Sequence, residues 1–376
     1  MFRGIDPRDY TVATFGPNGP PQTGDLPELN ATVHRLATNW RNPEGARSDY
    51  PLPWVRSLRH FALEIVRRAR LLSDVVRSDG CGAMMVTSSA GPDLAAGLIA
   101  SRIARIPFFV YMLDNWRYVI SQDRALRPFA GPLQRIVLSG SRAVFVPNEW
   151  LASELERQSG CRCVVVANPV DHMKLVSAPL PGPSWPSTAG EVRIVYTGQV
   201  YAAQADSFAR LIHALDSHRL DAVSLHVYSG NVDGAVFATS IPGRVVIHDY
   251  VTPASIHEVQ RHADILFLPL AFASPYPEII RTAAPAKLGE YLASGRPILI
   301  HAPAESYPAM LARRDGIAEL VDQPAAELLV ESIVRLMDRP DVRALYVRNA
   351  RSTAEILYSA EATTDRFAVA LQTLLA

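Results

Sequence analysis

Cysteine is scarce in this chain, and the few cysteines present form no recognisable pattern. The chain has three cysteines, which are Cys81, Cys161 and Cys163. Their number is odd, and no two of them form a CxxC pair. A disulfide framework needs paired cysteines, and a structural zinc site usually needs closely spaced ones. The sequence therefore argues against both, and it predicts a reducing compartment.

An excess of either charge and a long hydrophobic run are also missing. The 37 Lys and Arg residues balance 37 Asp and Glu residues, which argues against nucleic acid as a partner. Arginines interrupt every apolar stretch before it reaches the roughly 18 residues that span a bilayer. The first ten residues are polar and contain a proline, unlike a signal peptide. We therefore expect a cytoplasmic protein, whose membrane contact, if any, is peripheral and at the inner face.

Short β-rich apolar runs alternate with helical stretches along the whole chain. This alternation is typical of parallel sheets covered by helices on both faces, which is an α/β fold. The expected strands of the first half are Tyr10–Phe15, Ala83–Thr87, Pro107–Leu113, Ala143–Pro147 and Cys163–Ala167. Those of the second half are Val192–Thr197, Val223–Tyr228, Arg244–His248, Ile265–Pro269, Pro297–Ile300 and Ala318–Val321.

A proline-rich segment divides the chain into two domains, as its 376 residues are many for one core. Residues 176–190 contain four prolines within eight positions and are expected to form a semi-rigid linker. Residues 1–175 and 191–355 then form two doubly wound, Rossmann-like domains that face each other across a cleft, a preferred place for a ligand. Residues 356–376 are expected to form a C-terminal helix that packs back on the first domain.

The most informative segment places a lysine and a glutamate one helical turn apart, just before a buried strand. Lys287 and Glu290 share one helix face, with Pro285 at the expected start of the helix and Gly295 at its end. A cation in the first turn gains nothing from the helix dipole, so Lys287 is expected to face an anion. A carboxylate beside it suits ribose hydroxyls. Together they indicate a nucleotide bound at the carboxyl ends of parallel strands, although an exposed ion pair would show the same spacing.

Four phrases, in this order, resemble the nucleotide-sugar glycosyltransferases of the GT-B fold, especially the retaining family 4, also called group 1. They are Asn168–Asp171, Val195–Gly198, His262–Pro269 and Pro285–Pro297. The resemblance runs from about residue 100 to the end. It implies a hexosyltransferase that moves a sugar from a nucleoside-diphosphate sugar to an acceptor hydroxyl, with retention, in polysaccharide or glycoconjugate synthesis. No cofactor is implied, and no metal is expected because the sequence has no Asp-x-Asp pair.

The resemblance also assigns roles in the donor site. Lys287 would neutralise the leaving diphosphate, the amide of Gly198 would contact it, and Glu290 would hold the ribose, with Leu288 placed between them. Tyr250 falls where relatives contact the base, although a core tyrosine is the alternative.

Two departures from the family concern cations and carboxylates. Gln199 and Gln204 stand where relatives place an arginine and a lysine, and Thr282 stands where they place a first glutamate. A remodelled loop would bring Glu278 or Arg281 to the sugar, whereas Glu278 is otherwise a solvated loop acid.

The first domain offers an acceptor-side residue and a basic helix. Asp114 follows a strand and either orients the acceptor hydroxyl or caps a helix, and Asn148 poses the same choice. The expected helix Trp54–Val76 has an apolar stripe and many arginines, which fits either an anionic membrane or a core-facing surface helix. If the membrane interpretation holds, the acceptor is lipid-linked.

The beginning of the chain and the activity itself leave alternatives open. Family members open with a strand, a glycine-rich turn and a helix, whereas Tyr10–Phe15 resembles the second strand, so the first βα unit is expected to be missing. The alternative takes Tyr10–Phe15 as the first strand and Gly16–Gly19 as its turn. A nucleotide-sugar epimerase of the same fold and a non-catalytic partner subunit that has lost the site are the competing functions.

Overall fold

The computed structural model describes residues 5–16, 31–37, 53–88, 91–121, 123–170, 190–201, 203–230, 237, 243–274 and 277–376. The chain divides into two compact units. Unit 1 comprises Met1–Val166 and Thr364–Ala376, and unit 2 comprises Ala167–Thr363. The predicted linker, residues 176–190, lies outside the described residues except for Gly190.

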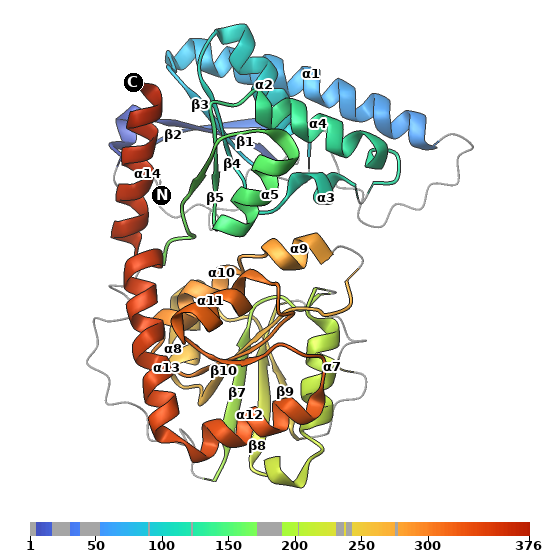
Figure 1. Cartoon of the computed structure of the whole chain (residues 1–376). Coiled ribbons are helices and arrows are strands. Elements are labelled where there is room, and N and C mark those ends of the chain that lie inside the picture. Colours follow the sequence, from blue (N-terminus) through green and yellow to red (C-terminus); the bar gives the residue numbers. More distant parts are fainter. Residues whose placement is uncertain are drawn as a thin grey trace. The chain divides into compact units, whose positions relative to one another are not determined.

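Unit 1 contains a four-stranded parallel sheet of order β3-β4-β5-β6 and a separate parallel pair, β1-β2 (Figure 1). The strands are β1 (Thr11–Gly16), β2 (Thr32–Ala37), β3 (Met84–Thr87), β4 (Phe108–Tyr111), β5 (Ala143–Val146) and β6 (Cys163–Val165). The helices are α1 (Pro53–Asp79), α2 (Asp93–Ala104), α3 (Trp116–Ile120), α4 (Arg127–Ser139), α5 (Glu149–Ser159) and α14 (Ala360–Leu375), whose first four residues belong to unit 2. The expected strands are confirmed to within two residues, and β2 was not predicted.

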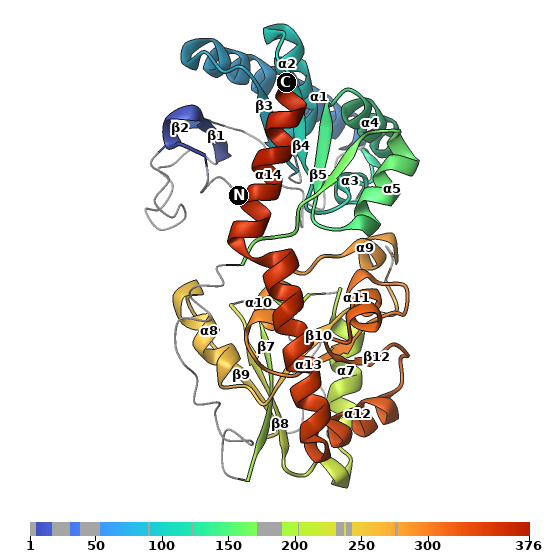
Figure 2. The same ribbon diagram turned by 60° about the vertical axis from the view of Figure 1, so that its left-hand side comes forward.

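Two cores cover the two faces of the four-stranded sheet. On one face, α1, α2, α4 and α5 pack on alternate strand residues such as Phe108, Val110 and Val144. The other face is covered by α14 (Figure 2). Phe367 and Leu374 of this helix belong to one buried cluster with Phe109 and Phe145 of the sheet. Strands buried on both faces explain why their sequences are continuous apolar runs rather than alternating ones.

The apolar stripe of α1 belongs to the first of these cores. Phe61, Ala69, Leu72 and Val76 are buried, and α1 packs against α2. The core-facing interpretation of this helix is therefore confirmed. The apolar face that a membrane would need is already occupied by protein.

Strand β1 pairs with β2 and with no other strand among the described residues. Its side chains Ala13 and Phe15 pack on the core that α1 covers. The predicted turn Gly16–Gly19 lies outside the described residues from residue 17 onward. Whether a first βα unit is missing stays a prediction.

Unit 2 is a six-stranded parallel sheet of order β12-β11-β10-β7-β8-β9. The strands are β7 (Val192–Thr197), β8 (Val223–Tyr228), β9 (Val245–His248), β10 (Ile265–Pro269), β11 (Ile298–His301) and β12 (Glu319–Val321). The helices are α7 (Ala205–Ala214), α8 (Pro253–Arg261), α9 (Pro277–Thr282), α10 (Ala286–Ala293), α11 (Tyr307–Asp315), α12 (Ala326–Asp338) and α13 (Pro340–Thr353). All six expected strands are confirmed, three of them with identical bounds.

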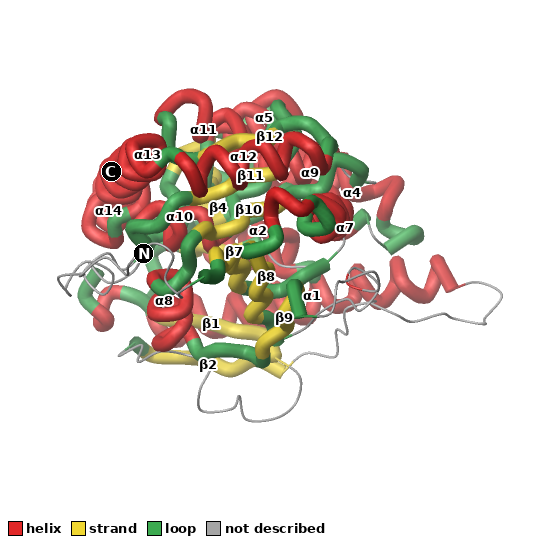
Figure 3. Tube along the Cα trace, turned by 90° about the horizontal axis from the view of Figure 1, so that it is seen from below, coloured by secondary structure: helices red, strands yellow, loops and turns green. Residues whose placement is uncertain are grey.

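Helices lie on both sides of this sheet, with α8 and α10 on one side of β7 and α7 on the other (Figure 3). Val192, Ile194 and Tyr196 of β7 face α7 and pack with its buried Phe208. Both units are thus Rossmann-like α/β structures, as the sequence predicts. No described helix has the length and apolar character needed to cross a membrane.

Candidate donor site in unit 2

The structure brings Gly198 and Lys287 together at the carboxyl end of β7. Gly198 has φ 118°, a conformation that favours glycine, and a Cβ built on it would lie 3.0 Å from Lys287 Nζ. Lys287 comes from the first turn of α10, which begins after Pro285 as the sequence predicts. The two residues are 89 positions apart in the sequence, so the fold and not local structure creates this contact.

Tyr196 fixes the direction of the Lys287 ammonium. The Tyr196 hydroxyl donates to the carbonyl of Gln199 at 2.6 Å, because a carbonyl only accepts. Its oxygen therefore accepts from Lys287 Nζ, also at 2.6 Å, and Nζ lies 4.1 Å from the centre of the Tyr196 ring. The ammonium is thus held by a hydroxyl and an aromatic face, at a distance typical of a cation–π contact.

Lys287 has no ion-pair partner in the described part of the chain. Among the described residues no carboxylate lies within 4.0 Å of its Nζ, whose hydrogen-bond partner is the Tyr196 hydroxyl. Burial lowers the pKa of Lys287 to about 8, and the negative charge of Glu290 opposes this only in part. At neutral pH the site therefore holds a largely charged ammonium that lacks a counterion, which is the electrostatic condition for binding an anion.

Glu290 lies one turn further along α10 and is held by a buried amide. Gln260 of α8, fully buried, donates from Nε2 to Glu290 Oε2 at 2.9 Å and to Thr197 Oγ1 at 3.1 Å. The Thr197 amide in turn donates to the Tyr291 hydroxyl at 3.0 Å. The carboxylate is therefore fixed from the end of β7, and it is not an exposed ion-pair member.

One predicted contact is wrong in its details. The Gly198 amide donates to the Tyr228 carbonyl at 2.9 Å within the β7–β8 ladder, so this N–H is not available to a diphosphate. The role of Gly198 is instead to leave room beside Lys287. Leu288 has a buried side chain, and its amide donates to the Pro285 carbonyl at 2.9 Å.

The remaining donor-site candidates lie on neighbouring elements. Tyr250 follows β9 and is 65% exposed, with its ring over Gly230, so the core alternative for this tyrosine is wrong. Glu278 and Arg281 both lie on α9, which precedes α10. Their part in sugar binding stays a prediction.

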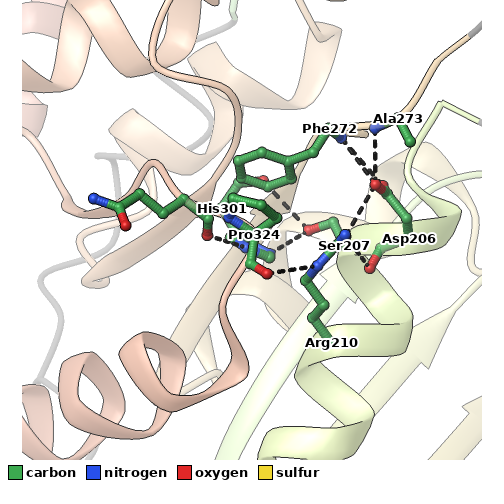
Figure 4. A network of polar contacts seen from close by, with 8 residues as sticks. Asp206, Ser207, Arg210, Phe272, Ala273, His301 and Pro324 are labelled. Carbon is green, nitrogen blue, oxygen red and sulfur yellow. Dashed lines mark hydrogen bonds and ion pairs between the residues drawn. The ribbon is translucent and has the colours of Figure 1, made fainter.

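A network of polar contacts fixes the loop that leads from β10 toward α9 (Figure 4). Asp206, in the first turn of α7, accepts from the amides of Phe272 and Ala273 at 3.0 and 2.9 Å. Arg210 pairs with Asp206 at 2.9 Å and lies over the Phe272 ring. The Asp206 carboxylate therefore holds the start of this loop against α7, and the Arg210 guanidinium compensates the charge of that carboxylate.

His301, at the end of β11, completes this network as a neutral side chain. Its Nε2 lies 3.2 Å from the Gln323 carbonyl, which only accepts, so Nε2 carries the hydrogen. Its Nδ1 then accepts from the Ser207 hydroxyl at 2.7 Å. Burial lowers the pKa of His301 to about 4, compared with about 6.5 for an exposed histidine.

We expect His301 to make the protein acid-sensitive. Because its folded pKa is lowered, the unfolded chain binds more protons between pH 6.5 and 4. The contribution to the free energy of unfolding is complete above pH 6.5 and is lost as pH falls toward 4, by up to about 3 kcal/mol. Urea unfolding at several pH values measures this slope. His301→Gln should flatten it, and equal slopes in both proteins would contradict the assignment.

Unit 1 places Asp114 at the carboxyl end of β4. Asp114 is exposed, and α3 is preceded by Asn115 rather than by Asp114, so the capping alternative for Asp114 is wrong. Asn148, in contrast, is fully buried and accepts from the Leu151 amide at 2.8 Å, so Asn148 caps α5. A role for Asp114 toward an acceptor stays a prediction.

Three residues of the site were not singled out from the sequence. Tyr196, Gln260 and Tyr291 orient Lys287, Glu290 and Thr197, respectively. Tyr291 follows Glu290 directly and Tyr196 lies two residues before Gly198, and this closeness in the sequence was the available signal. Gln260 carried none, because its role depends on α8 packing beside α10. In the described residues, no three His, Cys, Asp or Glu side chains gather as metal ligands would.

Comparisons with known proteins bear on the family and the fold of the chain. Residues 1–170 match the sequence family described as Glycosyl transferase 4-like domain. A search of curated proteins by sequence gave no match.

Several solved structures share the fold across nearly the whole chain. A sucrose-phosphate synthase from Thermosynechococcus elongatus has a TM-score of 0.69 at 13% identity, covering 96% of this chain and 88% of its own. A glycosyltransferase from Rickettsia africae has a TM-score of 0.68 at 11% identity, with 98% and 99% covered. HepE from Anabaena, in complex with UDP and glucose, has a TM-score of 0.63 at 15% identity, with 92% and 87% covered.

The fold is therefore GT-B. Together with the match of residues 1–170, it supports a glycosyltransferase that resembles group 1, and with it a transferase activity.

Proposed function

We propose that this protein transfers a hexosyl unit from a nucleoside-diphosphate sugar to an acceptor hydroxyl, with retention at the anomeric carbon, in polysaccharide or glycoconjugate synthesis. One observation carries the proposal. The Lys287 ammonium lies beside Gly198, and no carboxylate among the described residues pairs with this ammonium. HepE, whose structure contains UDP and glucose, shares this fold, and this supports a nucleoside-diphosphate sugar as the donor.

The chemistry needs charge stabilisation more than covalent catalysis. As the bond between the anomeric carbon and the diphosphate oxygen breaks, negative charge grows on the diphosphate. Lys287, preorganised by Tyr196, would stabilise that charge without reorganisation. Glu290 would hold the ribose. No metal or other cofactor is required for these roles.

The acceptor side of the proposal rests on unit 1. Asp114, exposed at the carboxyl end of β4, would orient the acceptor hydroxyl. Unit 1 contains more arginines than acidic residues, and this supports an acceptor carried by a lipid at the inner face of the membrane.

A thermal-shift series with nucleoside-diphosphate sugars tests donor binding. A donor at a hundred times its dissociation constant should stabilise the protein by about 2.7 kcal/mol. Gly198→Ala should lose this shift, because the added methyl would lie 3.0 Å from Lys287 Nζ.

Gly243→Ala is the matched control for this experiment. Gly243 also has a positive φ, 80°, but no atom lies within 4 Å of its added Cβ. The variant therefore introduces similar backbone strain without touching Lys287, and its donor-induced shift should match that of the wild type.

Two other outcomes would replace the proposed activity. Donor binding without transfer or hydrolysis would indicate a non-catalytic partner subunit, which the glutamines at positions 199 and 204 would then explain. Conversion of the donor to its epimer without any acceptor would indicate an epimerase. Absence of binding by every donor would remove the proposal altogether.

A further inference from the structure

Two of the three cysteines lie in direct contact where α5 leads into β6. Helix α5 ends at Gly160, whose φ is 62°, and Cys161 follows this glycine directly. Cys163 is the first residue of β6. The sulfur atoms of Cys161 and Cys163 are 3.8 Å apart, which is within hydrogen-bond distance for sulfur. The sharp passage from helix to strand therefore brings two thiols together.

Backbone hydrogen bonds hold the chain on both sides of this contact. The Val144 amide of β5 donates to the Arg162 carbonyl at 2.9 Å, and the Cys163 amide donates to Glu156 Oε1 at 3.1 Å. Cys161 is 8% exposed, whereas Cys163 is only partly buried. The two thiols are thus positioned by fixed backbone, and a small molecule in solution can reach the pair from the side of Cys163.

The charges around the pair favour reaction with an anion. The hydrogen bond from the Cys163 thiol lowers the pKa of Cys161, although burial opposes this effect. Arg162, which stands between the two cysteines, is exposed and attracts a negatively charged reagent. At Cys81, in contrast, burial and the charge of Asp79 raise the pKa of the thiol. The pair is therefore the more reactive thiol site.

We propose that Cys161 and Cys163 form a reversible dithiol–disulfide site whose reagent is a small anionic disulfide, such as glutathione disulfide. The thiolate of the pair attacks one sulfur of the reagent, the S–S bond of the reagent breaks, and one small thiolate leaves. The second cysteine then gives up its proton and attacks the mixed disulfide, so that an internal disulfide forms and the second small thiol leaves. The protein loses two electrons and two protons, and the reagent gains them.

The spacing of the two cysteines makes this bond a labile one. A disulfide between Cys161 and Cys163 encloses a single intervening residue, and closing so short a loop stabilises a fold least. The bond is therefore easily reduced and does not serve as a structural staple. This agrees with the reducing compartment that the sequence predicts, in which disulfides are transient. The site needs neither donor nor acceptor, so it and the proposed transferase activity can fail separately.

Thiol counting on the full chain tests the proposal. The protein is incubated with glutathione disulfide, quenched with acid and denatured, and its free thiols and intact mass are measured. The wild type should fall from three free thiols to one, should carry no glutathione, and should regain all three thiols with dithiothreitol. The two thiols of the pair should disappear at least about tenfold faster than that of Cys81, because the thiolate is the reacting species.

Single variants separate a paired site from two independent thiols. Cys161→Ser and Cys163→Ser should each retain one glutathione on the remaining cysteine of the pair, because no second thiol is left to displace it. Cys81→Ser is the matched control and should lose both of its thiols at the wild-type rate. Three unchanged thiols in the wild type would overturn the proposal. So would glutathione that stays bound to the wild type, or a disulfide that joins two chains or includes Cys81.

Discussion

Lys287→Ala is expected to lower kcat on the order of 10²-fold, and to raise the donor KM much less. A cation that contacts the departing diphosphate meets more negative charge in the transition state than in the ground state. The magnitude is that of losing one preorganised electrostatic contact to a developing anion. Steady-state kinetics with the donor found by thermal shift measure both parameters.

The pH dependence of the rate tests the role of Lys287 independently. Lys287 acts in its protonated form, and its pKa in the free protein is lowered to about 8 by burial. The wild-type kcat/KM should therefore fall as pH rises through about 8, and Lys287→Ala should not show this loss. Lys287→Arg should retain part of the activity and move the loss to higher pH, because a guanidinium stays charged there.

Stability separates a functional lysine from a structural one. The folded pKa of Lys287 lies below its ordinary value, so its charge opposes folding near pH 7. Lys287→Ala should therefore melt no lower than the wild type while losing activity. Arg281→Ala is the companion variant. If Lys287→Ala changes neither kinetic parameter and Arg281→Ala abolishes turnover, the diphosphate lies against α9 instead.

The elements of unit 2 could be predicted from the sequence because their signals are local. The buried parallel strand β10 is a continuous apolar run, and Pro285 and Gly295 bound α10. Lys287 and Glu290 could be predicted as a pair because helical spacing places them on one face. Strand β2 was missed because its six residues, Thr32–Ala37, mix polar and apolar side chains without an apolar run.

The contacts that orient the site could not be predicted, since each joins residues far apart in the sequence. Tyr196 and Lys287 are separated by 91 positions, and Gln260 and Glu290 by 30. The Gly198 amide was assigned to a ligand because a glycine turn after a strand often binds phosphate. That amide instead donates to the Tyr228 carbonyl of β8. This bond exists because β7 and β8 are neighbours in the sheet, and the order of strands cannot be read from the local sequence.

An exposed apolar surface on unit 1 illustrates the same limit. The sequence placed the amphipathic signal on the α1 segment, where apolar residues repeat at helical spacing. Packing against α2 buries that stripe, whereas the isoleucines of α2 and α4 remain at the surface. Periodicity in the sequence identifies an apolar helix face but not the element that packs on it. Only the packed structure shows which apolar faces remain exposed to solvent.

Glu290→Ala is expected to lower kcat/KM on the order of 10²-fold, mainly through a higher donor KM. A carboxylate that accepts two ribose hydroxyls contributes binding in the ground state and the transition state alike, at about 1.5–3 kcal/mol for each charged hydrogen bond. The fold should survive, because Gln260 keeps its bond to Thr197. Glu258→Ala, which removes an exposed glutamate from α8, is the control and should leave the kinetics unchanged.

A donor that lacks ribose hydroxyls makes this test specific for the proposed contact. The wild type should prefer the ribose donor to its deoxy analogue, whereas Glu290→Ala should treat the two alike, because the hydroxyl and the carboxylate are two ends of one interaction. An unchanged rate for Glu290→Ala would leave Glu290 as a structural partner of Gln260. A lower rate with full discrimination between the two donors would place the carboxylate near the sugar or diphosphate instead. Equal loss of rate and discrimination would tie Glu290 to the ribose, and would place the nucleotide across the carboxyl end of β7 with its diphosphate against Lys287.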